Sequence, residues 1–169
     1  MDPERLGLLI DRHAAALELF ARQWSDEPQD VVQEAFVSLA GQPVPPLDPP
    51  AWLFRTVRNR AVNSGIARKR RRRHEANAAG STEPWFEQNP ESVADIDPDS
   101  AREALASLPI EQREVIVAHL WGGLTFAQIA ELAGLSSSST HRLYHAGLSA
   151  LRERLGVPCR KNTSRRIPN

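Results

Sequence analysis

Residues 124–155 read LTFAQIAELAGLSSSSTHRLYHAGLSALRERL, and this stretch decides the fold. Thr125 is followed three positions later by Gln128, a capping box that marks the start of a short helix. Gly134 can adopt the left-handed backbone conformation that a tight turn between helices requires. Ser136 can cap the helix that follows. The spacing predicts a helix-turn-helix, with Leu135 filling the corner between its two helices.

The second helix of this motif begins with short polar side chains. In a DNA-binding helix-turn-helix, the start of the second helix faces base edges in the major groove. The alternative is a helical hairpin in a bundle, with a polar face exposed only to solvent. The side chains able to donate or accept hydrogen bonds here are Ser137, Ser138, Ser139, His141, Arg142 and His145.

The rest of the chain also has helical periodicity, and no useful length of strand alternation occurs. Apolar spacing predicts a first helix of about 20 residues near the N-terminus. Asp26 and Pro28 indicate the start of a second helix, and five prolines exclude residues 41–50 from a helix or a central strand. Helices are predicted again from Ala101 and after Pro109. We therefore expect an all-α protein with two small helical domains.

Charge is segregated along the chain, although the formal net charge is zero. Residues 1–48 carry nine acidic and three basic side chains, whereas residues 49–74 carry nine basic side chains and no acid. Residues 75–103 reverse this with eight acids and one arginine. We predict domains at 1–75 and 99–156, an acidic linker at 76–98 and a basic tail at 157–169.

The third helix, running from about Trp52 into the tract Arg68–Arg73, is the strongest candidate for contact with a polyanion. No acid nearby relieves the repulsion between its basic side chains, so phosphates are the expected counter-charge. The alternative is a solvated run of charge. Trp52 and Phe54 are expected to be core residues, although an aromatic side chain here could instead stack on an unpaired base.

Other function classes find little support. The single cysteine, Cys159, excludes an intramolecular disulfide and a Cys-rich zinc site. His141 and His145 could form a metal pair, but the sequence shows no third ligand, and no catalytic motif occurs. No signal peptide or membrane span is visible. We expect a cytoplasmic protein without a cofactor, a metal or enzymatic activity.

Taken together, three segments resemble the extracytoplasmic-function (ECF) sigma factors of the sigma-70 family. They are DVVQEAF at 30–36, AWLFRTVRNRAVNSGIARKRRRR at 51–73, and the stretch from Leu108 to Leu155. The resemblance covers roughly residues 5–75 and 99–155. It implies a subunit that binds core RNA polymerase and directs promoter recognition, DNA melting and transcription initiation. A stand-alone helix-turn-helix regulator is the alternative, but it leaves the acidic second helix unexplained.

The resemblance also implies a role for each segment. Region 2, the predicted domain at residues 1–75, would bind the clamp helices of the polymerase β′ subunit. The residues implied are Asp30, Val32, Gln33, Glu34 and Phe36. The third helix would read and melt the −10 element through Arg55, Arg58, Asn59 and Asn63, with Arg68, Lys69, Arg70 and Arg71 on the DNA backbone. Region 4, the predicted domain at residues 99–156, would bind the β flap of the polymerase and the −35 element. The residues implied for the −35 element are Thr125, Ser137, Ser138, Ser139, His141, Arg142 and His145.

Two positions depart from the family pattern. Family members commonly carry Asp where Asn63 stands and a basic residue where His141 stands.

The acidic linker resembles the segment that passes through the RNA exit path of the polymerase. The resemblance also implies an anti-sigma factor as a further partner.

Overall fold

The computed structural model describes residues 2–75 and 97–156, and every regular element in these ranges is a helix. The N-terminal half contains α1 (Pro3–Ala21), α2 (Pro28–Ala40) and α3 (Pro49–Glu75). The C-terminal half contains α4 (Pro98–Ala106), α5 (Ile110–Leu120), α6 (Phe126–Ala133) and α7 (Ser137–Arg154). The predicted all-α fold is confirmed. None of the described helices is long and apolar enough to cross a membrane.

The first three helices pack against one another through the apolar faces that the sequence predicts. Leu17, Phe20, Leu39, Leu53 and Phe54 are fully or almost fully buried there. The five prolines of residues 41–50 led us to expect no helix before residue 51, but α3 begins at Pro49. Asp48 caps it, with its Oδ1 accepting a hydrogen bond from the backbone N–H of Ala51 at 3.0 Å, and Pro49–Pro50 form the first turn. Proline is tolerated there because the first N–H groups of a helix have no partner within it.

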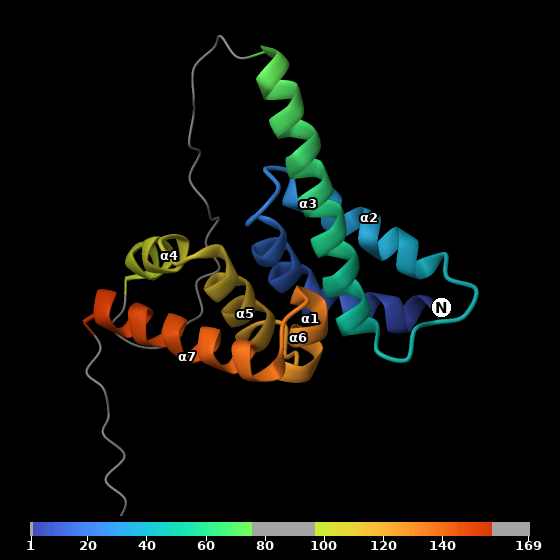
Figure 1. Ribbon diagram of the computed structural model, residues 1–169. Helices are drawn as coiled ribbons and strands as arrows, with labels where there is room; N and C mark the ends of the chain where they lie inside the picture. Colours follow the sequence, from blue (N-terminus) through green and yellow to red (C-terminus); the bar gives the residue numbers. More distant parts are fainter. Residues whose placement is uncertain (1, 76–96, 157–169) are drawn as a thin grey trace, which may run out of the picture.

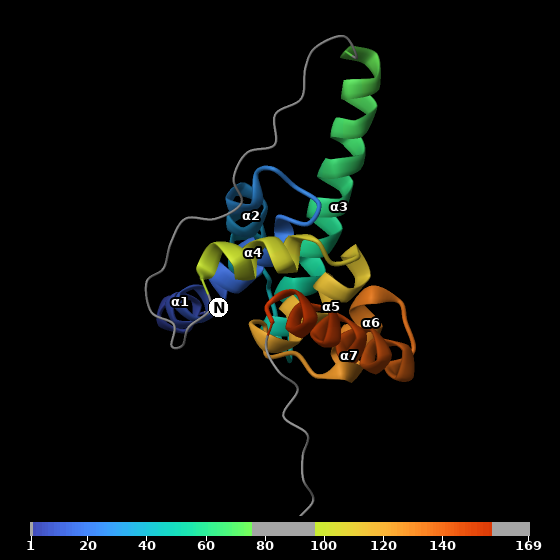
Figure 2. The ribbon, with the colours of Figure 1, turned by 90° about the vertical axis from the view of Figure 1, so that its left-hand side faces the viewer.

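The end of α3 extends beyond the other helices, as both views of the ribbon show (Figures 1 and 2). This end contains the Arg68–Arg73 tract, which is thus on a helix, although its side chains lie outside what the structure describes. The predicted linker, with Trp85 and Phe86, also lies outside the described residues up to position 96, as do Cys159 and the basic tail.

The helix-turn-helix is confirmed in its local detail. The Thr125 hydroxyl accepts from the N–H of Gln128 at 3.3 Å, and the side chain of Gln128 accepts from the N–H of Thr125 at 2.7 Å. Gly134 is left-handed with a φ of 69°, and Ser136 caps α7 by accepting from the N–H of Ser139 at 3.1 Å. The prediction for Leu135 was wrong.

Leu135 is 36% exposed at the turn, so it does not fill the corner between the two helices. Leu124, Ile129 and Leu132 are buried and belong to the core cluster. All three residues precede the turn. Leu124, Ile129 and Leu132 therefore supply packing that the sequence analysis had assigned to Leu135.

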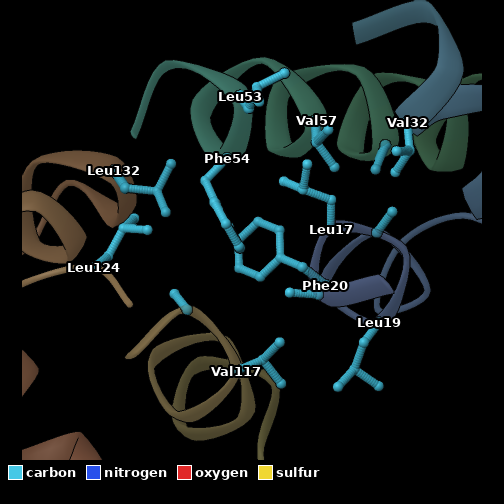
Figure 3. Packing of buried hydrophobic residues seen from close by; sticks show 14 of the residues in the cluster. Leu17, Leu19, Phe20, Val32, Leu53, Phe54, Val57, Val117, Leu124 and Leu132 are labelled. Carbon is cyan, nitrogen blue, oxygen red and sulfur yellow. The ribbon is translucent and has the colours of Figure 1, made fainter. Parts of the chain in front are cut away.

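The two halves share one hydrophobic core. Buried residues of α1, α2 and α3 belong to the same cluster as buried residues of α5 and α6. In Figure 3, Phe54 of α3 points between Phe20 of α1, Val117 of α5 and the leucines 124 and 132. The sequence predicted separate domains on a tether, but in this structure the halves lie in direct contact.

Candidate nucleic-acid interface

The polar face of α2 follows the predicted pattern only in part. Asp30, Gln33 and Glu34 are exposed. Val32 and Phe36, also assigned to the polymerase surface, are 3% and 6% exposed and belong to the core. Burial leaves them no surface for a partner in this structure, so we no longer place them at that interface. They instead anchor α2 in the hydrophobic core.

Glu34 has a partner that the sequence reading missed. Its carboxylate pairs with Arg60 of α3, and Arg60 also donates to the hydroxyl of Ser38 at 2.7 Å. A basic side chain of α3 thus packs along α2 and joins the two helices. Nothing in local periodicity gives this pairing, since the residues are 26 positions apart.

The exposed face of α3 holds the predicted −10 residues Arg55, Asn59 and Asn63. Arg58 is less accessible: its side chain is 28% exposed, and its guanidinium carbon lies 5.7 Å from the ring centroid of Trp24. That distance is within the range of a cation–π contact. Phe54 is fully buried, which confirms it as a core residue, and Trp52 packs against the core in part.

Two of these arginines are already paired within the protein. The Nε of Arg58 donates to Oε1 of Glu114 on α5 at 2.5 Å, and Arg55 pairs with Glu131 on α6. The Glu114 side chain is 5% exposed, whereas that of Glu131 is 68% exposed. Burial raises the pKa of the Glu114 carboxyl above its ordinary value, although Arg58 beside it acts in the opposite direction.

The predicted −35 residues lie together on the outer face of α6 and α7. Ser137, Ser138, His141, Arg142 and His145 are exposed, Ser139 is partly so, and Thr125 caps α6 beside them. Buried Gly147 of α7 lies against Ile116 of α5, where an added Cβ would lie 2.6 Å from the Ile116 Cδ1. This close approach fixes α7 on α5.

The histidine pair forms part of an aromatic cluster. The Nε2 atoms of His141 and His145 are 3.0 Å apart, and the His141 ring also contacts Phe126. Across residues 2–75 and 97–156, no group of three or more His, Cys, Asp or Glu side chains is placed to hold a metal ion.

Comparison with known proteins agrees with this architecture. The family described as Sigma-70, region 4 matches residues 99–151. The ECF RNA polymerase sigma factor SigL of Mycobacterium tuberculosis, matched in strains H37Rv and CDC 1551, is 31% identical over 165 residues. That match covers 88% of this chain and 89% of SigL. The chain belongs to the ECF sigma factors of the sigma-70 family.

Solved structures support the fold of this sigma factor. The sigma factor RpoE in complex with the anti-sigma factor NepR, from Bartonella quintana, is similar with a TM-score of 0.70 and 22% identity, over 91% of this chain and 96% of that one. CnrH in complex with the cytosolic domain of CnrY gives 0.56 and 24%, over 92% and 90%. As an ECF sigma factor, the protein functions in transcription initiation, in which it acts with RNA polymerase at promoter DNA.

Proposed function

We propose that this sigma factor divides its work among three surfaces: α2 for core polymerase, α3 for the −10 element, and α6 with α7 for the −35 element. The observation that carries the proposal is the separation of charge. Exposed carboxylates gather on α2, basic side chains on α3 and short polar side chains at the start of α7, and the Glu34–Arg60 pair joins the first two of these surfaces. Region 2 would comprise residues 1–75 and region 4 residues 99–156.

The α2 surface suits a basic protein partner. Asp30 and Gln33 present a carboxylate and an amide beside Glu34, whose carboxylate also pairs with Arg60, and this face would repel DNA and attract the positive groups of a protein. Changing Asp30→Lys should weaken binding to core polymerase about tenfold, equivalent to about 1.4 kcal/mol. Gln29→Lys is the control because Gln29 is also exposed on α2 and also becomes lysine, with a charge change of +1 against +2 for Asp30→Lys. Equal losses in both variants would count against this surface.

The α3 surface suits single-stranded promoter DNA. Arg55, Arg58, Asn59 and Asn63 supply hydrogen-bond donors, and the tract beginning at Arg68 supplies positive charge for the phosphates. Extruding a base costs a few kcal/mol, which contacts in a pocket and stacking can offset. With Arg55→Ala and Asn59→Ala together, we expect lost opening of intact promoters but retained transcription from a premelted bubble. Equal loss on both templates would argue against a melting role.

Transcription with core polymerase on a library of promoter sequences tests the function as a whole. We expect a subset of templates to gain specific transcription when this protein is added. No complex with core and no template gain would overturn the proposal. We further propose that an anti-sigma factor binds the protein, as NepR binds RpoE in the Bartonella quintana complex. We place it in the cytoplasm, without catalytic activity or cofactor.

A further inference from the structure

A pocket of about 380 Å³ lies beside α1, away from the surfaces discussed so far. Side chains of α1 form one wall, Asp48 and Pro50 at the start of α3 form another, and the turn between α5 and α6 forms the third with Gln128. Its volume falls within the range of about 300–1,000 Å³ that is typical of sites for small ligands. None of the described residues that line it belongs to the surfaces proposed for polymerase or DNA. The proposed function therefore leaves this pocket without a role.

One face of α1 brings two arginines to the pocket. Arg5, Leu8 and Arg12 are spaced three and four positions apart, so they share a face of the helix. Because a helix rises 1.5 Å per residue, the two arginines lie about 10 Å apart along its axis. Across residues 2–75 and 97–156, neither guanidinium forms an ion pair or a hydrogen bond. Two positive charges at the pocket are thus free to bind an anion.

A buried histidine forms part of the same wall. His13 is 8% exposed, and its Nδ1 is buried without a hydrogen-bond partner among the described residues. Buried polar atoms are almost always paired with protein or water, so such an exception calls for an explanation. Burial, and then the charge of Arg12, lower the pKa of His13, although Asp48 acts in the opposite direction. The ring is therefore uncharged at neutral pH and has a nitrogen that the protein leaves unused.

The carboxylate in the pocket does not neutralise the arginines. Asp48 accepts a hydrogen bond from the N–H of Ala51 at 3.0 Å through Oδ1, and one from Nε2 of Gln128 at 2.5 Å through Oδ2. Both of its oxygens are thus engaged by neutral donors, and positive charge remains in excess around the pocket. Apolar side chains form much of the remaining lining, namely Leu8, Leu9, Pro50 and Leu124.

We propose that this pocket binds a small organic anion that carries two negative charges, of the phosphate monoester or dicarboxylate class. Arg5 and Arg12 bind its charged groups, because guanidinium forms charge-assisted hydrogen bonds with phosphate and carboxylate alike. A phosphate monoester carries a charge of about −1.5 to −2 at pH 7, which matches two arginines. The leucines of α1 contact the body of the anion, and its presence in the pocket supplies a partner for the His13 ring.

Calorimetric titration of the full chain tests the proposal with two probes, phenyl phosphate and adipate. Phenyl phosphate represents the monoesters, and adipate represents the dicarboxylates with a charge at each end of an apolar chain. Hexanoate, with one charge on a chain of the same length, is the control ligand. We expect one of the two probes to bind more tightly than hexanoate, and the probe that binds identifies the class of anion. Failure of both probes to bind would overturn the proposal.

A pair of double variants separates the pocket from other basic surfaces, since the Arg68–Arg73 tract also attracts anions. Arg5→Ala with Arg12→Ala should weaken binding of the probe about tenfold or more. Arg152→Ala with Arg154→Ala is the matched control, because these exposed arginines of α7 carry the same charge and lie outside the pocket. Equal losses in the two double variants would mean that the anion binds by overall charge alone, which contradicts a built site.

A carboxylate placed inside the pocket should block it without removing an arginine. Leu8 is 67% exposed, so Leu8→Glu should leave the fold intact and repel the anion. Ala15→Glu adds the same charge at another exposed position of α1, outside the pocket, and should bind the probe like the parent protein. Circular dichroism would confirm that both variants keep their helices. Unchanged affinity of Leu8→Glu would exclude this pocket as the site.

Nitrogen-15 spectra of the His13 imidazole locate the bound probe directly. We expect the Nδ1 signal to move when the probe saturates the parent protein, because the nitrogen or its neighbour in the ring gains a partner. The Arg5→Ala, Arg12→Ala variant should show no such movement at the same probe concentration. An imidazole signal that stays in place in the saturated parent protein would locate the anion elsewhere and refute the proposal. These measurements use neither polymerase nor DNA, so their outcome is separate from that of the proposed function.

Discussion

Arg58 and Glu114 lie 56 positions apart, yet their side chains form an ion pair between the two halves that is more buried than the Arg55–Glu131 pair. The Nε of Arg58 donates to one carboxylate oxygen at 2.5 Å, and its terminal nitrogen donates to the other at 3.5 Å. A pair of this kind offers little net stability, because removing both charges from water offsets their attraction. It does, however, specify which surfaces meet, since leaving either charge buried alone is costly.

Stability should depend on pH through Glu114. Burial raises the pKa of this carboxyl in the folded state, so the folded protein binds its proton more tightly than the unfolded chain does. The resulting contribution to stability is fully present below the ordinary glutamate pKa and is lost as the pH rises through the raised value. Glu114→Gln, with no titrating proton, should flatten the pH dependence in that window.

The measurement is the urea-unfolding free energy of both proteins across the acidic range. Glu103→Gln is the control, because Glu103 is exposed on α4 and is not among the groups that shift the Glu114 pKa. A slope that Glu114→Gln leaves unchanged would mean that another group governs it.

Phe54→Ala should cost about 3–5 kcal/mol of unfolding free energy, because it leaves a cavity at the junction of the two halves. Its ring packs edge-on against Phe20, with centroids 5.0 Å apart. Calorimetry and urea unfolding would measure the loss, and the single transition of the parent should separate into two as the halves uncouple. Leu47→Ala serves as the comparison because Leu47 is fully exposed. A loss under 1 kcal/mol would show that Phe54 contributes little to the junction.

Thr125→Ala should destabilise the protein by about 1 kcal/mol, because the Gln128 N–H loses its acceptor and the capping box is broken. Thr125→Ser keeps the hydroxyl and should recover most of that loss in the same unfolding experiment. If Thr125 also contacts the −35 phosphates, both hydroxyl-bearing proteins should bind duplex promoter DNA more tightly than Thr125→Ala. Equal stability of the alanine and serine variants would show that the cap is not energetically important.

Arg142→Ala should weaken binding to duplex promoter DNA and lower the slope of log K against log salt by about 0.9, the value for one lost phosphate contact. If Arg142 instead reads a base, affinity should fall with a smaller change of slope and with relaxed sequence preference. Arg152→Ala provides the comparison, since Arg152 is exposed near the opposite end of α7. Identical salt slopes for all three proteins would remove Arg142 from the interface.

Local signals determined much of the architecture. The helix ends at Thr125, Gly134 and Ser136 follow from hydrogen bonds and backbone angles within four residues, and the structure has them where the sequence predicts. The order of acidic and basic segments likewise needs no tertiary information, because it is a property of the amino-acid sequence itself. The family resemblance rests on these same segments and is confirmed by the comparison with SigL.

Tertiary structure alone decided which of those side chains are available. Val32 and Phe36 share a helix with the exposed Asp30, yet they lie in the core because α2 packs against α1 and α3. Arg58 is partly covered because α5 brings Glu114 to it, and Leu135 is exposed while Leu124 and Leu132 are buried. Periodicity identifies the side of a helix that seeks burial, but the packing of distant helices determines what that side meets.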